Sequence, residues 1–168
     1  MTGSLRIAVL TVSDTRTLEN DTSGQFLCDA LIEDGHILAD RQIEVDDMYH
    51  LRARVSSWIA SAGVDVILLT GGTGFTTRDS TPEAINPLLD VDIPGFGELF
   101  RHLSYLEIGT STVQSRAIAG MANNTLVFCM PGSTGACKTA WNGILNEQLN
   151  KEFRPCNFAE LIKNGGSH

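Results

Sequence analysis

Short apolar runs recur along the chain, and residues typical of turns follow each of them. Three of these runs are almost wholly apolar, which is typical of strands buried on both faces of a parallel sheet. A fourth run alternates in part between apolar and polar residues, as a half-buried strand does. We therefore predict strands at residues 6–12, 36–45, 64–70 and 125–130.

Between these runs, apolar residues recur at the spacing of a helix. Leu51, Val55, Trp58 and Ile59 fall on one helical face. We predict an amphipathic helix that ends at Gly63 and places Trp58 in the core rather than against a cofactor. Cap residues and apolar spacing predict further helices from 21–24 to Gly35, at 82–89, after a turn at 94–98, and after a break at 131–134.

Two stretches have a weaker pattern. Residues 110–120 pass from polar to apolar and end in an alanine-rich strand candidate. Asn123 and Asn124 predict a turn before the strand at 125–130. From about residue 150 the pattern is irregular, so we expect 150–168 to form a tail whose last residues are loose.

The alternation of strands and helices, without repeats or a linker, predicts a single domain over residues 1–168. Its expected fold is a three-layer α/β/α sandwich with a mostly parallel, Rossmann-like sheet. Such sheets bind ligands beyond the carboxyl ends of their strands. Four segments should therefore meet at one edge: Ser13 and Asp14, Asp46 and Asp47, residues 71–79, and residues 131–134.

Composition and charge narrow the range of partners. The 168 residues are 42% hydrophobic and 19% charged, which suits a globular domain with a substantial core. A formal net charge of −8 argues against non-specific binding to nucleic acid or to an anionic membrane, because both require a basic surface. No apolar run is long enough to span a bilayer and the N-terminus lacks a signal-peptide pattern, so we expect a cytoplasmic protein.

The cysteines and histidines are scattered through the chain. Cys28, Cys129, Cys137 and Cys156 form no Cys-x-x-Cys pair, which argues against a zinc site or a disulfide framework and favours reduced thiols. Cys129 lies within an apolar run, and we interpret it as a small core residue.

The most informative segment follows the run at 64–70. Gly71, Gly72 and Gly74 allow a sharp turn whose amides can approach a ligand closely. Arg78 offers a planar fork for phosphate or carboxylate, and Asp79 offers a carboxylate for a cation or a proton. The turn therefore predicts a site for an anionic ligand, with a purely structural glycine turn as the alternative.

The same segment continues into a predicted helix start. Ser80 and Glu83 have the spacing of a capping box, and Pro82 suits the first helical turn. Two familiar glycine motifs are excluded. No lysine lies near the turn, as a Walker loop requires, and Thr77 stands where a dinucleotide-binding fingerprint needs its third glycine.

Three aspartates are candidates for chemistry. Asp79 could hold Mg²⁺ beside a substrate phosphate, or only complement the charge of the helix start. Asp46 ends the second predicted strand, whereas Asp47 could be a solvated neighbour or a helix cap. Asp14 is a weaker candidate, because an aspartate after a strand often only forms a turn.

Basic and hydroxyl residues supply further candidates. Arg116 could pair with a ligand phosphate or with a surface carboxylate. Ser133 and Thr134 begin a helix, where they could cap it, bind a phosphate through the same amides, or do both.

Several segments together resemble one known family. Residues 71–84, Gly-Gly-Thr-Gly-Phe-Thr-Thr-Arg-Asp-Ser-Thr-Pro-Glu-Ala, resemble the signature of the molybdopterin-binding, molybdenum cofactor biosynthesis family. The ending at 154–158 resembles that family's protein B branch rather than its dedicated adenylyltransferase. The resemblance runs from about Arg6 to Phe158, with further matching segments at 11–14, 21–24, 94–98, 115–117 and 131–134.

The resemblance implies a three-layer α/β fold, and a trimer or a hexamer of two trimers. It also implies binding of molybdopterin, and active relatives transfer AMP from Mg-ATP to the terminal phosphate of this pterin. Two essential aspartates of those relatives match Asp46 and Asp79, which would hold Mg²⁺. The implied substrate-binding residues are Ser13, Asp14, Gly71, Gly72, Thr73, Gly74, Thr77, Arg78, Thr81, Ser115, Arg116, Pro131, Gly132, Ser133 and Thr134.

Two alternatives to the transferase stay open. A non-catalytic carrier would bind molybdopterin or a nucleotide and would need neither Mg²⁺ nor two intact carboxylates. A structural assembly module would reuse the fold for scaffolding, although both acidic positions are present. Other enzymes of the molybdenum cofactor pathway are candidate partners in each case.

Overall fold

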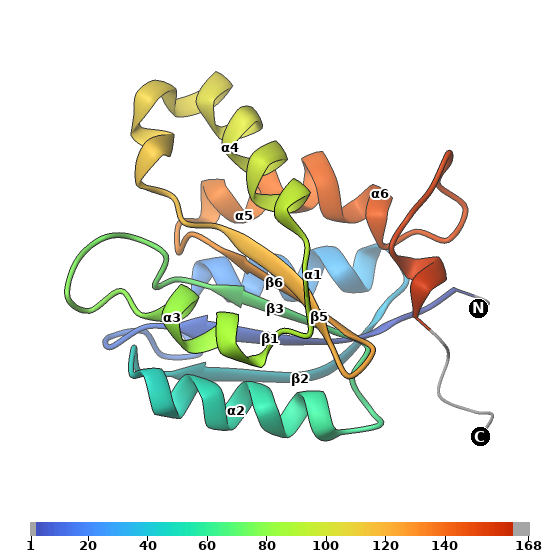
Figure 1. Cartoon of the computed structure of the whole chain (residues 1–168), viewed down its shortest axis with the longest axis horizontal. Helices are drawn as coiled ribbons and strands as arrows, with labels where there is room; N and C mark the ends of the chain where they lie inside the picture. Colours follow the sequence, from blue (N-terminus) through green and yellow to red (C-terminus); the bar gives the residue numbers. More distant parts are fainter. Residues whose placement is uncertain (1–2, 163–168) are drawn as a thin grey trace.

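The computed structural model describes residues 3–162, in which six strands form one sheet (Figure 1). The strand order is β2-β1-β3-β6-β5-β4. The first four strands of this order are parallel, whereas β5 pairs antiparallel with both β6 and β4. The strands are β1 (Arg6–Val12), β2 (Ile37–Glu44), β3 (Val66–Thr70), β4 (Val91–Asp92), β5 (Ile118–Ala122) and β6 (Thr125–Met130).

Helices connect the strands and cover both faces of the sheet. The longest are α1 (Thr22–Glu33), α2 (Met48–Ala60) and α4 (Pro94–Ile108). The shorter helical segments are α3 (Thr81–Ile85), α5 (Thr134–Ala140), a π-helix (Trp141–Leu145), α6 (Asn146–Gln148), and 3₁₀ helices at Asn86–Leu88, Gly109–Gln114 and Ala159–Leu161.

Two hydrophobic clusters lie on opposite faces of the sheet, because successive strand residues point to opposite sides. In β1, Ile7 and Val9 belong to the cluster that includes residues of α1, α4 and α5, whereas Ala8 and Leu10 belong to the cluster with α2 and α3. This arrangement confirms the predicted α/β sandwich. None of the helices in the described part of the chain has the length and apolar character needed to cross a membrane.

The predicted strands match β1, β2, β3 and β6 within two residues at each end. Asn123 and Asn124 form the predicted turn, with φ of 47° and 65° that suit a two-residue hairpin between β5 and β6. Trp58 is 5% exposed and donates its Nε1–H to Asp40, as expected for a core residue. Cys129 is fully buried, and all four cysteines are free thiols.

The turn predicted at 94–98 is wrong. Pro94 instead begins α4, where its missing N–H costs nothing because the first turn of a helix has no acceptor for it. The glycine at 97 has a packing role, since a Cβ there would lie 2.5 Å from the carbonyl oxygen of Ala117. Glycine therefore lets α4 approach the chain that leads into β5. The short strand β4 went unpredicted, because two residues carry too little periodicity.

One predicted helix and the predicted tail differ in part from the structure. The helix expected at 82–89 is divided into α3 and a 3₁₀ helix, with Pro87 inside the latter. The tail beyond residue 150 is irregular as predicted, but Ala159 and Ile162 are buried in the larger core cluster. The last residues, 163–168, which we expected to be loose, lie outside the described part of the chain.

Candidate functional site

The carboxyl ends of the four parallel strands form one rim of the sheet. The segments that follow β1, β2, β3 and β6 meet there, as the topology predicted. The amide of Gly71 donates to the carbonyl of Met130 over 2.9 Å, and a Cβ at Gly132 would lie only 3.2 Å from the Cα of Gly71. The turns after β3 and β6 are therefore packed directly against each other.

The turn after β3 requires glycine at two positions. Gly71 has φ of +111° and Gly72 has φ of +72°, a region that side chains with a Cβ rarely adopt. A Cβ at Gly72 would come within 2.2 Å of Thr81 Oγ1 and 2.9 Å of Asp46 Oδ2. Buried Thr81 closes the turn by donating its hydroxyl to the carbonyl of Gly71 over 2.8 Å. The sequence pattern thus encodes a rigid turn that has Asp46 directly behind it.

Asp46 is nearly buried behind this turn. Its Oδ1 accepts the backbone N–H of Ser80 at 3.1 Å and also the Ser80 hydroxyl, while its own N–H donates to Asp14 Oδ1 at 3.0 Å. Burial raises the pKa of Asp46, and the nearby charges of Asp79 and Asp14 raise it further, although the Ser80 hydrogen bonds act in the opposite direction. A cation would relieve this local excess of negative charge.

Asp79 lies on the same rim, directly before Ser80 in the chain. Its Oδ2 accepts the N–H and the hydroxyl of Thr76 at 2.9 and 2.6 Å. Burial alone would raise its pKa, but hydrogen bonds from Thr76 and Gly74 and the positive charge of Arg116 together lower the pKa. Asp79 is therefore the more acidic of the two carboxylates, and Ser80 links it to Asp46.

The capping box predicted from Ser80 and Glu83 is absent. Helix α3 does begin at Thr81, but Ser80 makes no side-chain cap bond because its hydroxyl donates to Asp46. Glu83 instead forms an ion pair with Arg116. Both side chains are used in tertiary contacts that local spacing could not reveal.

The two arginines of the rim are engaged by the protein itself. Arg78 donates from Nε and NH2 to both carboxylate oxygens of Asp14, at 2.9 and 2.7 Å. Arg116 pairs with Glu83, one of the two kinds of partner expected for it, and also donates to backbone carbonyls of the glycine turn. Neither guanidinium lies free beside the turn.

A cavity of about 430 Å³ opens beside the two turns. The predicted residues that line it are Gly71, Gly72, Thr73, Gly74, Asp79, Ser115, Pro131, Gly132 and Ser133. The hydroxyl oxygen of Ser115 is buried and has no hydrogen-bond partner among the described residues. A buried polar group without a partner is costly, so this oxygen is a natural contact for a ligand.

The opposite wall of the cavity was missed by the sequence reasoning. It comes from α4 and the 3₁₀ helix that follows, which contribute Phe100, Ser104, Ile108 and Thr112 among others. Phe100, Ser104 and Ile108 recur every four residues, and a polar residue within an otherwise apolar face was the signal that could have revealed this wall. The wall offers apolar surface and hydroxyl groups together.

The remaining predicted residues lie outside the cavity lining. Ser13 accepts the N–H groups of Thr15 and Arg16 and so stabilises the loop after β1. Thr77 is exposed at the tip of the 71–79 segment. Thr134 shares a hydrogen bond of 2.9 Å with the hydroxyl of Thr22 at the start of α1. The others outside the lining are Asp14, Asp46, Arg78, Thr81 and Arg116.

Ser133 both lines the cavity and caps a helix. Its side chain accepts the N–H of Ala136, and its backbone is extended, as at an ordinary N-cap. The hydroxyl of Ser23 donates to the carbonyl of Gly132 over 2.7 Å, which brings the start of α1 to the same turn. Two helix starts therefore meet at the turn after β6, where their dipoles favour a negative charge.

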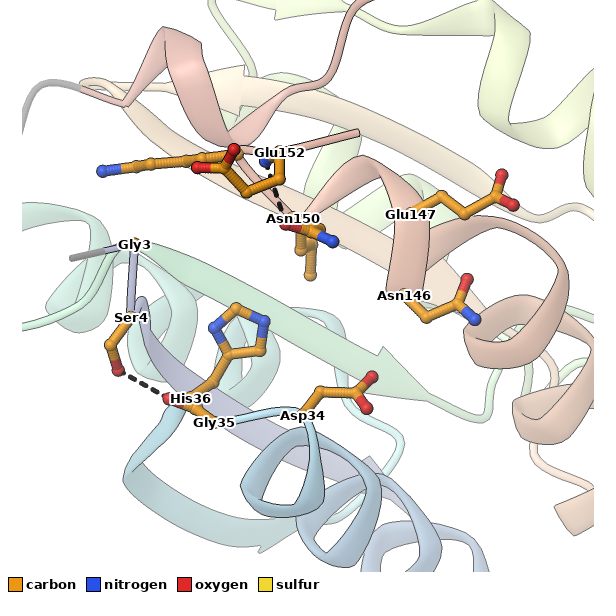
Figure 2. Close-up of a pocket in the computed structure, with 11 residues that line it drawn as sticks. Gly3, Ser4, Asp34, Gly35, His36, Asn146, Glu147, Asn150 and Glu152 are labelled. Carbon is orange, nitrogen blue, oxygen red and sulfur yellow. Dashed lines mark hydrogen bonds between the residues drawn. The ribbon is translucent and has the colours of Figure 1, made fainter. Parts of the chain in front are cut away.

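A second cavity, of about 410 Å³, lies away from the glycine turn, between the segments that precede β1 and β2 and the chain from α6 to Glu152. Figure 2 shows Asp34 and His36 on one wall and Asn146 and Asn150 on the facing wall. His36 Nδ1 accepts the N–H of Leu5, and burial lowers the pKa of this ring although the charge of Asp34 raises it. This cavity contains none of the predicted site residues, so the candidate site is the cavity at the glycine turn.

Comparison with known proteins identifies close relatives. A family described as a probable molybdopterin binding domain matches residues 8–151. The chain is 56% identical over 158 residues to molybdenum cofactor biosynthesis protein B of Escherichia coli (strain K12), covering 94% of this chain and 93% of that protein. It is 47% identical over 146 residues to the protein of the same name from Bacillus cereus, covering 86% of each. A crystal structure of a molybdenum cofactor biosynthesis protein B matches with a TM-score of 0.84 and 47% identity, covering 87% of this chain and 91% of that one.

Proposed function

The chain belongs to the molybdopterin-binding family of molybdenum cofactor biosynthesis proteins, and from that premise we propose that it binds molybdopterin and transfers AMP from Mg-ATP to the terminal phosphate of the pterin. A role in molybdenum cofactor biosynthesis follows from relatives that match nearly the whole chain. The observation that carries the transferase proposal is the pair Asp46 and Asp79, which Ser80 links on one rim beside the glycine turn.

In the proposed reaction, a phosphate oxygen of molybdopterin attacks the α-phosphorus of ATP in line and pyrophosphate leaves. Such a transfer depends on positioning and on charge neutralisation more than on covalent catalysis. Within the turn, the amides of Gly71 and Gly74 already donate to Met130 and Asp79, so those of Gly72 and Thr73 cradle phosphate oxygens. The buried hydroxyl of Ser115 binds the pterin. Ser133 and the helix that it begins orient the pterin or its phosphate.

Asp46 and Asp79 suit a magnesium ion. Mg²⁺ is usually held through one or two carboxylates, with water and substrate phosphates completing its shell. Among the described residues no group of three or more His, Cys, Asp or Glu side chains is placed to hold a metal, so an all-protein cage is not the geometry we propose. The ion would neutralise charge on the triphosphate, and the raised pKa of Asp46 marks a position where a cation is favourable.

The test is an assay of purified protein with Mg-ATP and molybdopterin that follows AMP transfer. We expect turnover in the wild type and its loss in Asp46→Asn and in Asp79→Asn, since each keeps the shape of the side chain and removes its charge. Glu152→Gln, on the rim of the second cavity, is the matched control and should keep full turnover. Full turnover in both aspartate variants would show that these carboxylates have no part in the transfer.

A carrier that binds molybdopterin without catalysis is the second candidate. One observation favours it: Arg78 and Arg116 are each paired with a carboxylate, so the positive charge that either could offer to a triphosphate is already compensated. Calorimetry separates the two functions. Binding of molybdopterin without binding of ATP, together with no turnover, would favour the carrier.

We also propose that the protein is a homo-oligomer, either a trimer or a hexamer, located in the cytoplasm. Apolar side chains on α4 and the following 3₁₀ helix are exposed, including Leu106 at 71% and Val113 at 73%. Neighbouring exposed apolar residues of this kind often mark protein interfaces. Sedimentation equilibrium at micromolar concentration should give the mass of three or six chains, and a monomer at that concentration would contradict the proposal.

A further inference from the structure

Arg116 forms hydrogen bonds to the segment that carries Asp79. It lies before β5, far from that segment in sequence, and its backbone N–H donates to the carbonyl of Thr73 over 3.1 Å. Its Nε and NH2 groups donate to the carbonyl of Gly74 at 3.0 and 2.6 Å, and NH2 also reaches the carbonyl of Asp79 at 3.3 Å. One side chain therefore contacts both ends of the loop from Gly74 to Asp79.

The guanidinium is itself held in place. Its NH1 forms an ion pair with Glu83 in helix α3, and its central carbon lies 5.0 Å from the centre of the Phe75 ring. Arg116 is largely buried, with 25% of its side chain exposed. Four of its five N–H donors already have an acceptor, so the side chain could offer a substrate phosphate the remaining NH1 hydrogen but not a two-pronged contact, unless it gave up contacts that hold the loop.

The other hydrogen bonds of the loop lie within it or at its exposed surface, and Ser80, directly after it, is bonded to Asp46. Phe75, Thr76, Thr77 and Arg78 are all exposed. The pair between Arg78 and Asp14 is exposed as well, and such pairs stabilise little. Asp79 is therefore held at the cavity rim from two sides: Arg116 binds the carbonyls at both ends of the loop, and Ser80, the next residue, is bonded to Asp46.

We propose that Arg116, oriented by Glu83, is a positioning residue that fixes the 73–79 loop and so holds Asp79 at the rim of the cavity. Its role in turnover rests on the proposed function of Asp79. A lysine could not replace it, because an ammonium group cannot reproduce the planar fork that spans the carbonyls of Gly74 and Asp79 and the carboxylate of Glu83. This assigns Arg116 to the support of the site rather than to contact with substrate.

Hydrogen exchange of the ligand-free protein tests whether Arg116 fixes the 73–79 loop. In Arg116→Met and in Arg116→Lys, we expect the amides of residues 73–79 to exchange about tenfold faster or more, with little change in the central strands. Arg154→Met is the matched control, since Arg154 also donates to two carbonyls and pairs with a glutamate, but in the C-terminal tail. Exchange in the 73–79 loop equal to that of the wild type in both Arg116 variants would overturn the proposal.

Glu83→Gln provides a variant that keeps the arginine. It should accelerate exchange in the same amides by a smaller factor, because the guanidinium loses its charged partner and keeps its carbonyl contacts. If Arg116→Met fails to fold, Arg116→Lys still decides whether the guanidinium fixes the loop, and Glu83→Gln tests how that guanidinium is oriented. Loop exchange unchanged in Glu83→Gln would contradict the orienting role of Glu83.

Kinetics with Mg-ATP and molybdopterin test the consequence for turnover. A misplaced Asp79 should lower kcat on the order of 10²-fold in Arg116→Lys while KM for molybdopterin changes much less, because the pterin wall of the cavity is intact. Because an unfolded fraction would also lower the apparent kcat without changing KM, kcat is referred to the folded fraction, measured as the stoichiometry of molybdopterin binding by calorimetry. If the wild type transfers no AMP, the proposed function fails, and the exchange experiment still decides whether Arg116 fixes the loop.

Discussion

Replacing Gly72 with alanine should both destabilise the protein and disturb the site. The new Cβ would lie 2.2 Å from Thr81 Oγ1 and 2.9 Å from Asp46 Oδ2, and the residue would be held at φ of +72°. A side chain in the left-handed region costs about 1–2 kcal/mol. Crowding in a packed environment adds about 1–3 kcal/mol, because Thr81 is buried and bonded to Gly71 and cannot move freely. The expected loss in the free energy of unfolding is therefore about 2–5 kcal/mol.

Urea denaturation followed by circular dichroism measures this loss. Gly95→Ala is the matched control, because a Cβ at Gly95 meets no atom within 4 Å and the residue lies in helix α4. That change should be neutral or stabilise by up to about 1 kcal/mol, since alanine favours a helix more than glycine does. A Gly72→Ala protein as stable as the wild type would falsify the view that this turn admits only glycine.

Three further predictions follow from single residues. Burial raises the pKa of Asp46, so the contribution of this group to stability is greatest below its ordinary pKa and is lost as the pH rises through the folded-state value. Asp46→Asn should therefore be more stable than the wild type at pH 7. Urea titrations at pH 7 and at about pH 3.5 should show this difference in stability shrinking at the lower pH. Ser115→Ala removes a buried hydroxyl that has no hydrogen-bond partner among the described residues, so the urea midpoint should stay the same or rise, while calorimetry should show weaker molybdopterin binding. A lower urea midpoint would mean that the hydroxyl is bonded within the protein. Phe128 is 1% exposed and its ring contacts Phe96 and Phe158, so Phe128→Ala should lower the free energy of unfolding by about 3–5 kcal/mol. A fall in the thermal midpoint of less than a few degrees would contradict the packing described.

The strands, the main helices and the glycine turn could be predicted because their signals are local. An apolar run such as the one ending at Thr70 has to be buried, and Gly71 and Gly72 can adopt backbone conformations that other residues avoid. Parallel pairing then required the segments after four strands to share one edge of the sheet. The chain alone thus located the rim and named most of the residues that line the cavity.

Side-chain partners could not be predicted, because they join residues far apart in the sequence. Ser80 and Glu83 have the spacing of a capping box, yet each has a stronger tertiary partner, in Asp46 and in Arg116. Arg78 and Arg116 could equally have faced a phosphate by sequence pattern alone, and folding placed an acidic residue beside each of them.

The sequence by itself therefore determined the fold class, the order of the main elements and the edge of the sheet where the candidate site lies, because burial and backbone geometry act within short segments. Only the tertiary structure decided that α4 forms the far wall of the cavity, that Ser80 connects the two aspartates, and that Arg116 supports the loop. Those choices depend on which groups meet across the folded domain, where a charge or a hydroxyl binds the nearest partner that compensates for its lost water.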